Sequence, residues 1–138
     1  MLKSFIFVLA AIFVAVSSDC LSCICDRESN GCHPIGCNQD VDGIACGYFQ
    51  IHLPYYKDCG TPSKRPNESV EDAWKRCSED YNCASTCVKN YVKRYAQDCP
   101  NKGSCEQMSR IHNGGPQGCN KPKTEPYWNG IKACCGCT

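Results

Sequence analysis

The sequence predicts a disulfide-rich α+β domain that is mostly helical and carries one small antiparallel β-sheet. Three observations lead to this fold class. The chain has 138 residues, of which 16 are cysteines. An Asp-Gly turn and a β-branched, aromatic run lie together at residues 40–51. Segments with helix caps and helical apolar spacing lie before and after that run. One helix, a short sheet and then several helices is the order of an α+β protein.

The first 18 residues, MLKSFIFVLAAIFVAVSS, have the pattern of a secretory signal peptide. Lys3 provides a positive start, residues 5–16 form an apolar run, and small residues come before the expected cleavage point. The run is too short to span a membrane, and no second one follows. We therefore expect residues 1–18 to be removed, and residues 19–138 to form one domain of a secreted, extracellular protein.

Charge and cysteine content exclude several classes of protein. Removing residues 1–18 removes one of 15 basic residues, so 14 remain against 14 acidic ones. A net charge near zero argues against nucleic acid as a partner and against a polycationic membrane-disrupting peptide. The 16 cysteines all follow residue 18. An even number in a secreted chain predicts up to eight disulfides, although their pairing cannot be deduced from sequence.

Zinc is the alternative use for these cysteines. Cys20 and Cys23, and the group at residues 134–137, have the spacing of zinc-ligand pairs. A signal peptide and so many cysteines favour disulfides instead, so we expect neither a metal nor a cofactor.

The first half of the domain should contain one helix and the sheet. Asp19 can cap a helix over residues 20–29, which the run from Ser29 to Gly31 ends. The Asp42-Gly43 turn then leads into a strand over residues 44–51, in a small hairpin or three-stranded sheet.

The second half should be helical. Residues 61–67 have the composition of a surface loop, and they end in the only glycosylation sequon, at Asn67. The sequence predicts four helices after this loop. The first begins at a cap at Ser69 and ends near Cys77, and the second covers residues 83–96 after a cap at Asn82. The third runs from Ser104 to Gly114-Gly115, and the fourth covers residues 125–132 and starts from Thr124.

Glu28 and Asp40 form a candidate pair of catalytic carboxyl groups. Cleaving a glycosidic bond requires a protonated carboxyl that donates to the leaving oxygen and an ionised carboxylate that attacks or stabilises the cationic transition state. Glu28 shares the apolar face of its expected helix with Leu21 and lies in the last turn, where burial and the negative helix end favour the neutral acid. Arg27 opposes this preference. Asp40 lies beside a polar turn and should stay ionised. With 14 acidic residues in the chain, two unrelated solvated acids are the alternative interpretation.

Several motifs extend over nearly all of residues 19–138. They are the segment CLSCICDRESNGCHPIGCNQDVDGIACGYFQIHLPYYKDCG (20–60), AWKRC (73–77), CASTCVKNYVKRY (83–95), RIHNGGPQGC (110–119) and YWNG (127–130). With these motifs and its cysteine spacing, the chain resembles the invertebrate-type lysozyme family, also called the destabilase family. The resemblance implies a lysozyme-like α+β fold. It also implies hydrolysis of the β-1,4 bond between N-acetylmuramic acid and N-acetylglucosamine in bacterial peptidoglycan, for antibacterial defence or digestion of bacteria. The expected protein is a monomer.

The same resemblance assigns the site residues. Glu28 matches the family's proton donor, and Asp40 matches its second carboxylate. The expected substrate-binding residues are His52, Leu53, Pro54, Tyr55, Tyr56, Lys57, Asp58, Tyr91, His112, Asn113 and Gly114. Tyrosines offer flat apolar faces to sugar rings and hydroxyls for hydrogen bonds, although Tyr55 and Tyr56 could equally pack a small core.

Two other functions compete with this interpretation. Some family members resemble isopeptidases that use serines after the catalytic aspartate and a lysine after FQI. Here those positions read Asp42 to Ala45 and His52, so little or no isopeptidase activity is expected. A non-catalytic peptidoglycan-binding or sugar-binding module with the same fold remains the alternative to an enzyme.

Overall fold

The structure is a computed structural model and describes residues 19–138. The predicted signal peptide, residues 1–18, lies outside the described residues. The described helices and strands are α1 (Cys20–Ser29), β1 (Cys37–Asp40), β2 (Gly43–Cys46), β3 (Ile51–His52), α2 (Leu53–Asp58), α3 (Val70–Ser78), α4 (Tyr81–Tyr95), α5 (Ser104–Gly114) and α6 (Thr124–Cys135). Two short 3-10 turns, η1 (Ala96–Asp98) and η2 (Gly118–Asn120), flank α5. The mostly helical α+β fold class is confirmed.

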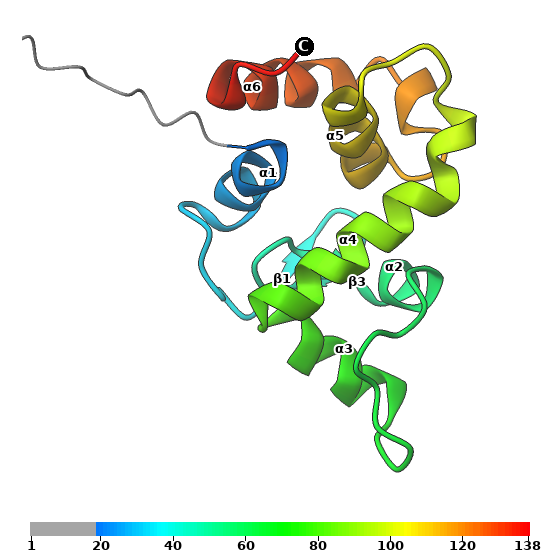
Figure 1. Ribbon diagram of the computed structural model, residues 1–138. Coiled ribbons are helices and arrows are strands. Elements are labelled where there is room, and N and C mark those ends of the chain that lie inside the picture. The colour runs from blue at the N-terminus through cyan, green and yellow to red at the C-terminus, as the bar shows by residue number, and fades with distance from the viewer. Residues whose placement is uncertain (1–18) are drawn as a thin grey trace, which may run out of the picture.

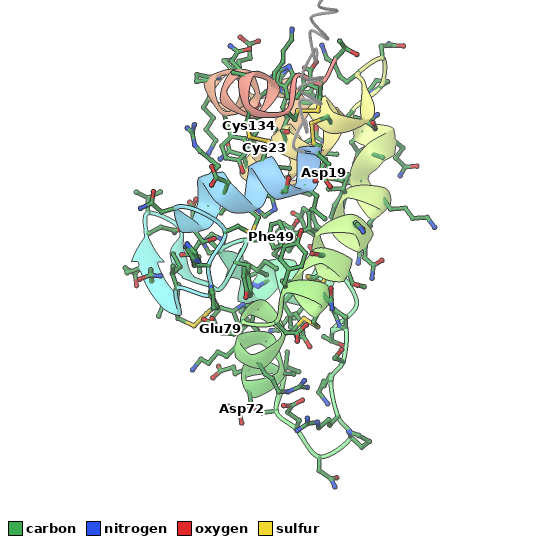
Figure 2. The ribbon with its side chains drawn as sticks, turned by 60° about the vertical axis from the view of Figure 1, so that its left-hand side comes forward. Asp19, Cys23, Phe49, Asp72, Glu79 and Cys134 are labelled. Atoms are coloured by element: carbon green, nitrogen blue, oxygen red, sulfur yellow. A yellow bond between two sulfur atoms is a disulfide. The ribbon has the colours of Figure 1, made fainter. Side chains whose placement is uncertain are left out.

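The helices form two groups joined by α4, the long helix that crosses the molecule diagonally in Figure 1. One group contains α1, α5 and α6, which pack on one another, and α4 contacts α5 at this end. The other contains α2 and α3 together with the three-stranded sheet, and α4 contacts both of these helices. Side chains such as Phe49, which is fully buried, fill the space between α1 and α4 (Figure 2). The carboxyl end of α1 therefore faces the sheet.

Eight disulfides use all 16 cysteines, as the even count predicted. Two of them fix α1 to its neighbours: Cys20–Cys105 reaches α5 and Cys23–Cys134 reaches α6. Figure 2 shows the latter pair between the two helices. The remaining bridges are Cys25–Cys32, Cys37–Cys46, Cys59–Cys87, Cys77–Cys83, Cys99–Cys119 and Cys135–Cys137. Both groups of cysteines considered as zinc ligands are bridged in this way.

The sheet is antiparallel with strand order β1-β2-β3. The Asp-Gly turn is confirmed, because Asp40 pairs with Gly43 across it. A continuous strand over residues 44–51 is wrong, since residues 47–50 form a turn between β2 and β3. Gly47 has φ +76° there, and a Cβ at this position would lie 1.7 Å from the carbonyl oxygen of Ser78. The backbone of the turn therefore packs directly against the end of α3.

Helix α2 was not expected, because residues 52–58 were considered only as a substrate-binding segment. Pro54 stands in its first turn, where a missing N–H costs nothing. Most other helices lie where they were predicted, but some caps differ. Asp80, not Asn82, caps α4 by accepting a hydrogen bond from the amide of Cys83 at 2.8 Å. The amino end of α5 follows Gly103 and has no side-chain cap. Within residues 19–138, none of the helices is both long and apolar enough for a membrane crossing.

Candidate active site

Glu28 lies at the carboxyl end of α1, where the chain is held on several sides. The helix stops because Asn30 adopts the left-handed conformation, with φ 56°. The Cys25–Cys32 disulfide closes the segment that contains Glu28. Ser29 donates a hydrogen bond to the carbonyl of Cys25 and accepts one from the amide of His33. These local constraints fix the direction in which the Glu28 side chain leaves the helix.

The carboxyl of Glu28 contacts side chains from two other helices. The hydroxyl of Tyr127, on α6, donates a hydrogen bond to Oε1 at 2.7 Å. Nε2 of His112, on α5, lies 3.4 Å from the same oxygen. The Glu28 side chain is 21% exposed, whereas that of His112 is 3% exposed. Glu28 is thus half-buried, with one oxygen held from inside the protein.

Asp40 has a different environment at the end of β1. Its Oδ1 accepts a hydrogen bond from the amide of Asp42 at 2.8 Å, and Nε2 of His52 lies 2.9 Å from Oδ2. The Asp40 side chain is 43% exposed. Desolvation raises the pKa of Asp40, but the hydrogen bonds from His52 and Asp42 outweigh it and lower the pKa below its ordinary value of 3.8. Asp40 is therefore ionised at neutral pH, as the polar turn predicted.

Both carboxyl groups line one groove with a volume of about 660 Å³. Its walls come from α1, the β1–β2 hairpin, α2, α4 and the end of α5. Seven of the predicted substrate-binding residues line it as well, namely His52, Pro54, Tyr55, Tyr91, His112, Asn113 and Gly114. The fold therefore brings together parts of the chain that are more than 70 residues apart in sequence.

Four predicted substrate-binding residues lie outside the lining of this groove. Leu53 lines an adjoining cavity of about 370 Å³. Tyr56 is fully buried, and its hydroxyl donates to the carbonyl of Pro62. Lys57 is exposed, and Asp58 accepts a hydrogen bond from the hydroxyl of Tyr95 at 3.0 Å. Tyr56 therefore packs in the core, which was the alternative to a substrate-binding role.

The aromatic residues of the groove also pack against one another. The rings of Tyr55 and Tyr91 stack with their centroids 3.6 Å apart and 11° between their planes. Burial, with Tyr95 and Asp58 nearby, raises the pKa of Tyr91 to about 12, so this hydroxyl stays protonated. The hydroxyl of Tyr55 lies 2.9 Å from Nδ1 of His112. This cluster links α2, α4 and α5, and through His112 it reaches the carboxyl of Glu28.

Sequence reasoning missed several residues of the site. Gln50, Val41, Lys121 and Lys123 line the groove, and Tyr127 bonds directly to Glu28. Tyr127 lies 99 residues after Glu28. Tyr127 belongs to the YWNG motif, on which the family resemblance partly rests, but the motif gave no physical reason to expect a role for this tyrosine in the site. The lysines are surface residues whose nearness to the acids arises only from the fold.

One group of potential metal-ligand atoms comes together within the described part of the chain. The sulfur atoms of Cys105, Cys135 and Cys137 lie within 4.8 Å of one another. Each of them is already part of a disulfide, so this group cannot bind zinc as thiolates.

The arrangement suits acid–base chemistry on a bond placed between the two walls. Glu28 is half-buried with one oxygen bonded to Tyr127, whereas Asp40 is more exposed and is kept ionised by its hydrogen bonds. Two carboxyl groups with unlike environments are what glycoside hydrolysis requires.

Known proteins are similar to this chain in sequence and in fold. Residues 17–134 match the destabilase family. Invertebrate-type lysozyme 3 of Caenorhabditis elegans is 58% identical over 138 residues, covering 99% of this chain and 98% of the relative. The invertebrate-type lysozyme of Ruditapes philippinarum is 48% identical over 122 residues, covering 88% and 84% of the two chains. The crystal structure of Tapes japonica lysozyme superposes with a TM-score of 0.74 at 48% identity, covering 86% of this chain and 90% of that one. A Meretrix lusoria lysozyme, solved in complex with PliI of Aeromonas hydrophila, gives a TM-score of 0.72 at 46% identity, covering 86% and 93%. The chain belongs to the destabilase family of invertebrate-type lysozymes.

Proposed function

We propose that this protein is a secreted lysozyme that hydrolyses the β-1,4 bond between N-acetylmuramic acid and N-acetylglucosamine in bacterial peptidoglycan. The observation that carries the proposal is the pairing of Glu28 and Asp40 in one groove, in unlike environments. Family membership and relatives named lysozymes support the same reaction. The proposed protein is a secreted monomer, and it acts in antibacterial defence or in the digestion of bacteria.

In this mechanism Glu28 is the acid. Its protonated carboxyl donates to the glycosidic oxygen as the bond from C1 to that oxygen breaks, so that the leaving sugar departs as an alcohol. Positive charge then develops at C1 and the ring oxygen. The carboxylate of Asp40, kept ionised by His52 and Asp42, stabilises this charge from the other wall of the groove. Glu28, now a carboxylate, removes a proton from water, and the water oxygen bonds to C1 to complete the hydrolysis.

The charges along the groove suit peptidoglycan. Lys121 and Lys123 line it together with the two acids. The Nζ of Lys121 donates to the carbonyl of Gly114 at 2.6 Å, which fixes its position at the rim. Peptidoglycan strands carry carboxylates on their peptide stems, and lysines beside a sugar-binding groove would attract them. A neutral polymer of N-acetylglucosamine would gain nothing from these charges.

Lysis of a peptidoglycan suspension tests the proposal. Wild type should reduce the turbidity and release reducing ends, whereas Glu28→Gln and Asp40→Asn should each lose at least about a hundredfold in rate. Glu125→Gln is a suitable control, because the Glu125 side chain is 66% exposed and lies outside the groove lining. The assignment of roles fails if both variants clear the suspension as fast as wild type. If wild type binds the suspension but releases no reducing ends, the protein is a sugar-binding module.

A further inference from the structure

The oxygen Oε1 of Glu28 lies close to polar groups from two helices remote in sequence, and one of them donates a hydrogen bond to it. The Tyr127 hydroxyl is 2.7 Å away and His112 Nε2 is 3.4 Å away. None of the hydrogen bonds among the described residues involves Oε2, although Glu28 lines the groove. The two oxygens of this carboxyl are therefore not equivalent.

The protonation of His112 follows from its partners. Nε2 lies 3.0 Å from the carbonyl oxygen of Phe49, which can only accept a hydrogen bond. Nε2 must therefore carry a proton. In the neutral ring, Nδ1 then accepts from the hydroxyl of Tyr55 at 2.9 Å. The imidazole thus presents an N–H, and never a lone pair, toward the carbonyl and toward Oε1 of Glu28.

Tyr127 is held as firmly as His112. Its side chain is buried, with 7% of the residue exposed, and the guanidinium of Arg27 lies 5.4 Å from the centre of its ring. Burial, together with the neighbouring Glu28, raises the pKa of Tyr127 well above its ordinary value of 10. The phenol is therefore a permanent donor over the working range of pH.

We propose that Tyr127 is a positioning residue whose hydroxyl holds Oε1 of Glu28 as an acceptor, with the imidazole of His112 packed beside the same oxygen, and so leaves Oε2 to carry the proton to the glycosidic bond. This inference rests on the proposed role of Glu28 as the acid. A carboxyl whose proton can sit on either oxygen spends part of its time with the proton directed away from the substrate. Fixing Oε1 by the Tyr127 hydroxyl removes that unproductive arrangement and keeps the side chain in one rotamer.

Tyr127→Phe tests the proposal, because it removes the hydroxyl and keeps the ring beneath Arg27. We expect kcat to fall by roughly tenfold. KM should stay the same, since Tyr127 does not line the groove. A phenol stabilises a carboxylate more strongly than a carboxylic acid. Without it, the alkaline limb of the kcat/KM profile should move upward.

Other charged and titratable groups around Glu28 remain in place in this variant. They are Arg27 on its own helix, His112 and Tyr55 on the inner side, and Asp40, Asp42, His52, Lys121 and Lys123 along the groove. The shift between wild type and variant can therefore be assigned to the missing hydroxyl.

Tyr95→Phe is the matched control. It removes a hydroxyl that donates to a different carboxylate, that of Asp58. Its kcat and pH profile should equal those of wild type. A second pair, His112→Gln and His112→Leu, tests the imidazole that packs beside Oε1. Glutamine can present an amide N–H at the place of Nε2 and should retain more activity than leucine at equal stability.

The outcomes separate this inference from the proposed function. If Glu28→Gln stays active, the assignment of the acid is wrong. If Glu28→Gln is inactive but Tyr127→Phe has the kcat and pH profile of wild type, the acid is correct and the positioning role is overturned. Thermal unfolding of each variant is measured alongside, and a fall in kcat with an unchanged alkaline limb would also count against the proposal, because loss of stability alone explains it.

Discussion

His52 on β3 holds the carboxylate of Asp40 on β1 across the intervening strand β2, with Nε2 at 3.1 Å from Oδ1 and 2.9 Å from Oδ2. His52 is the last residue of β3 and also the N-cap of α2, so one residue links the sheet, the helix and the site. Asp40 itself ends β1 and pairs with Gly43 across the turn. The ionised state of Asp40 therefore depends on the register of the whole sheet.

His52→Asn should reduce activity mainly on the acid side. Asparagine is a good N-cap and preserves α2, but its amide is too short to reach Asp40. Because His52 lowers the pKa of Asp40, its loss raises that pKa, and Asp40 becomes protonated at a higher pH than in wild type. The rate of lysis at about pH 4 should fall several-fold relative to the rate near neutrality.

His52→Gln is the control for that experiment, since its amide nitrogen can occupy the place of Nε2 and donate to Asp40. It should retain an acid limb close to that of wild type. Identical profiles for wild type and His52→Asn would mean that His52 does not tune Asp40.

The protein should not cleave γ-glutamyl-lysine isopeptide bonds. The positions where related isopeptidases would carry serines are Asp42 to Ala45, and His52 stands where a lysine would be. His112 cannot replace this machinery, because its two ring nitrogens are engaged by Tyr55 and Phe49. Release of nitroaniline from a γ-glutamyl-lysine anilide should match a blank without enzyme. Release that disappears on His112→Leu would contradict this prediction.

Local signals were sufficient to predict the frame around the two acids. Asp19 accepts the hydrogen bond of Ser22 at the start of α1, as expected of a cap, and the Asp42-Gly43 turn places Asp40 at the end of its strand. Ser69 likewise caps α3 by accepting from the amide of Asp72. These features depend on neighbours within a few residues, which the sequence displays directly.

Contacts between distant segments could not be predicted in the same way. The hydrogen bond from Tyr127 to Glu28 joins residues 99 apart, and nothing in the spacing of either segment signals it. The interruption of the strand at Gly47 could not be predicted for the same reason, because it depends on close packing of the turn backbone against Ser78. The stacking of Tyr55 on Tyr91 and the burial of Tyr56 also depend on which faces of α2 and α4 meet. The resemblance identified most of the groove-lining residues, but the physical role of each one required the fold.

The Cys23–Cys134 bridge should matter for activity as well as stability. It joins α1, which carries Glu28, to α6, which carries Tyr127, across a sequence separation of 111 residues. A single bridge over about 100 residues contributes up to about 4.7 kcal/mol, and the other long bridge, Cys20–Cys105, makes the effective loop shorter. The double variant Cys23→Ser/Cys134→Ser should unfold at a lower temperature and lose part of its kcat.

The double variant Cys135→Ser/Cys137→Ser is the comparison. That bridge spans a separation of only 2 residues and closes a very small loop. Its removal should lower the unfolding temperature much less. Equal losses of stability in the two double variants would show that loop closure does not govern the contribution of these bridges.

Gly47→Ala should destabilise the fold far more than Gly60→Ala. Both glycines have positive φ, +76° for Gly47 and +92° for Gly60, so each alanine adds the same kind of backbone strain, about 1 to 2 kcal/mol. A Cβ at position 60 meets nothing within 4 Å, whereas one at position 47 would overlap the carbonyl oxygen of Ser78. Backbone cannot move aside as a flexible side chain can, so Gly47→Ala should lose about 4 kcal/mol or more, or fail to fold. Denaturant unfolding of the two variants measures the difference. Equal free energies of unfolding would mean that the turn does not pack on α3 as closely as this structure has it.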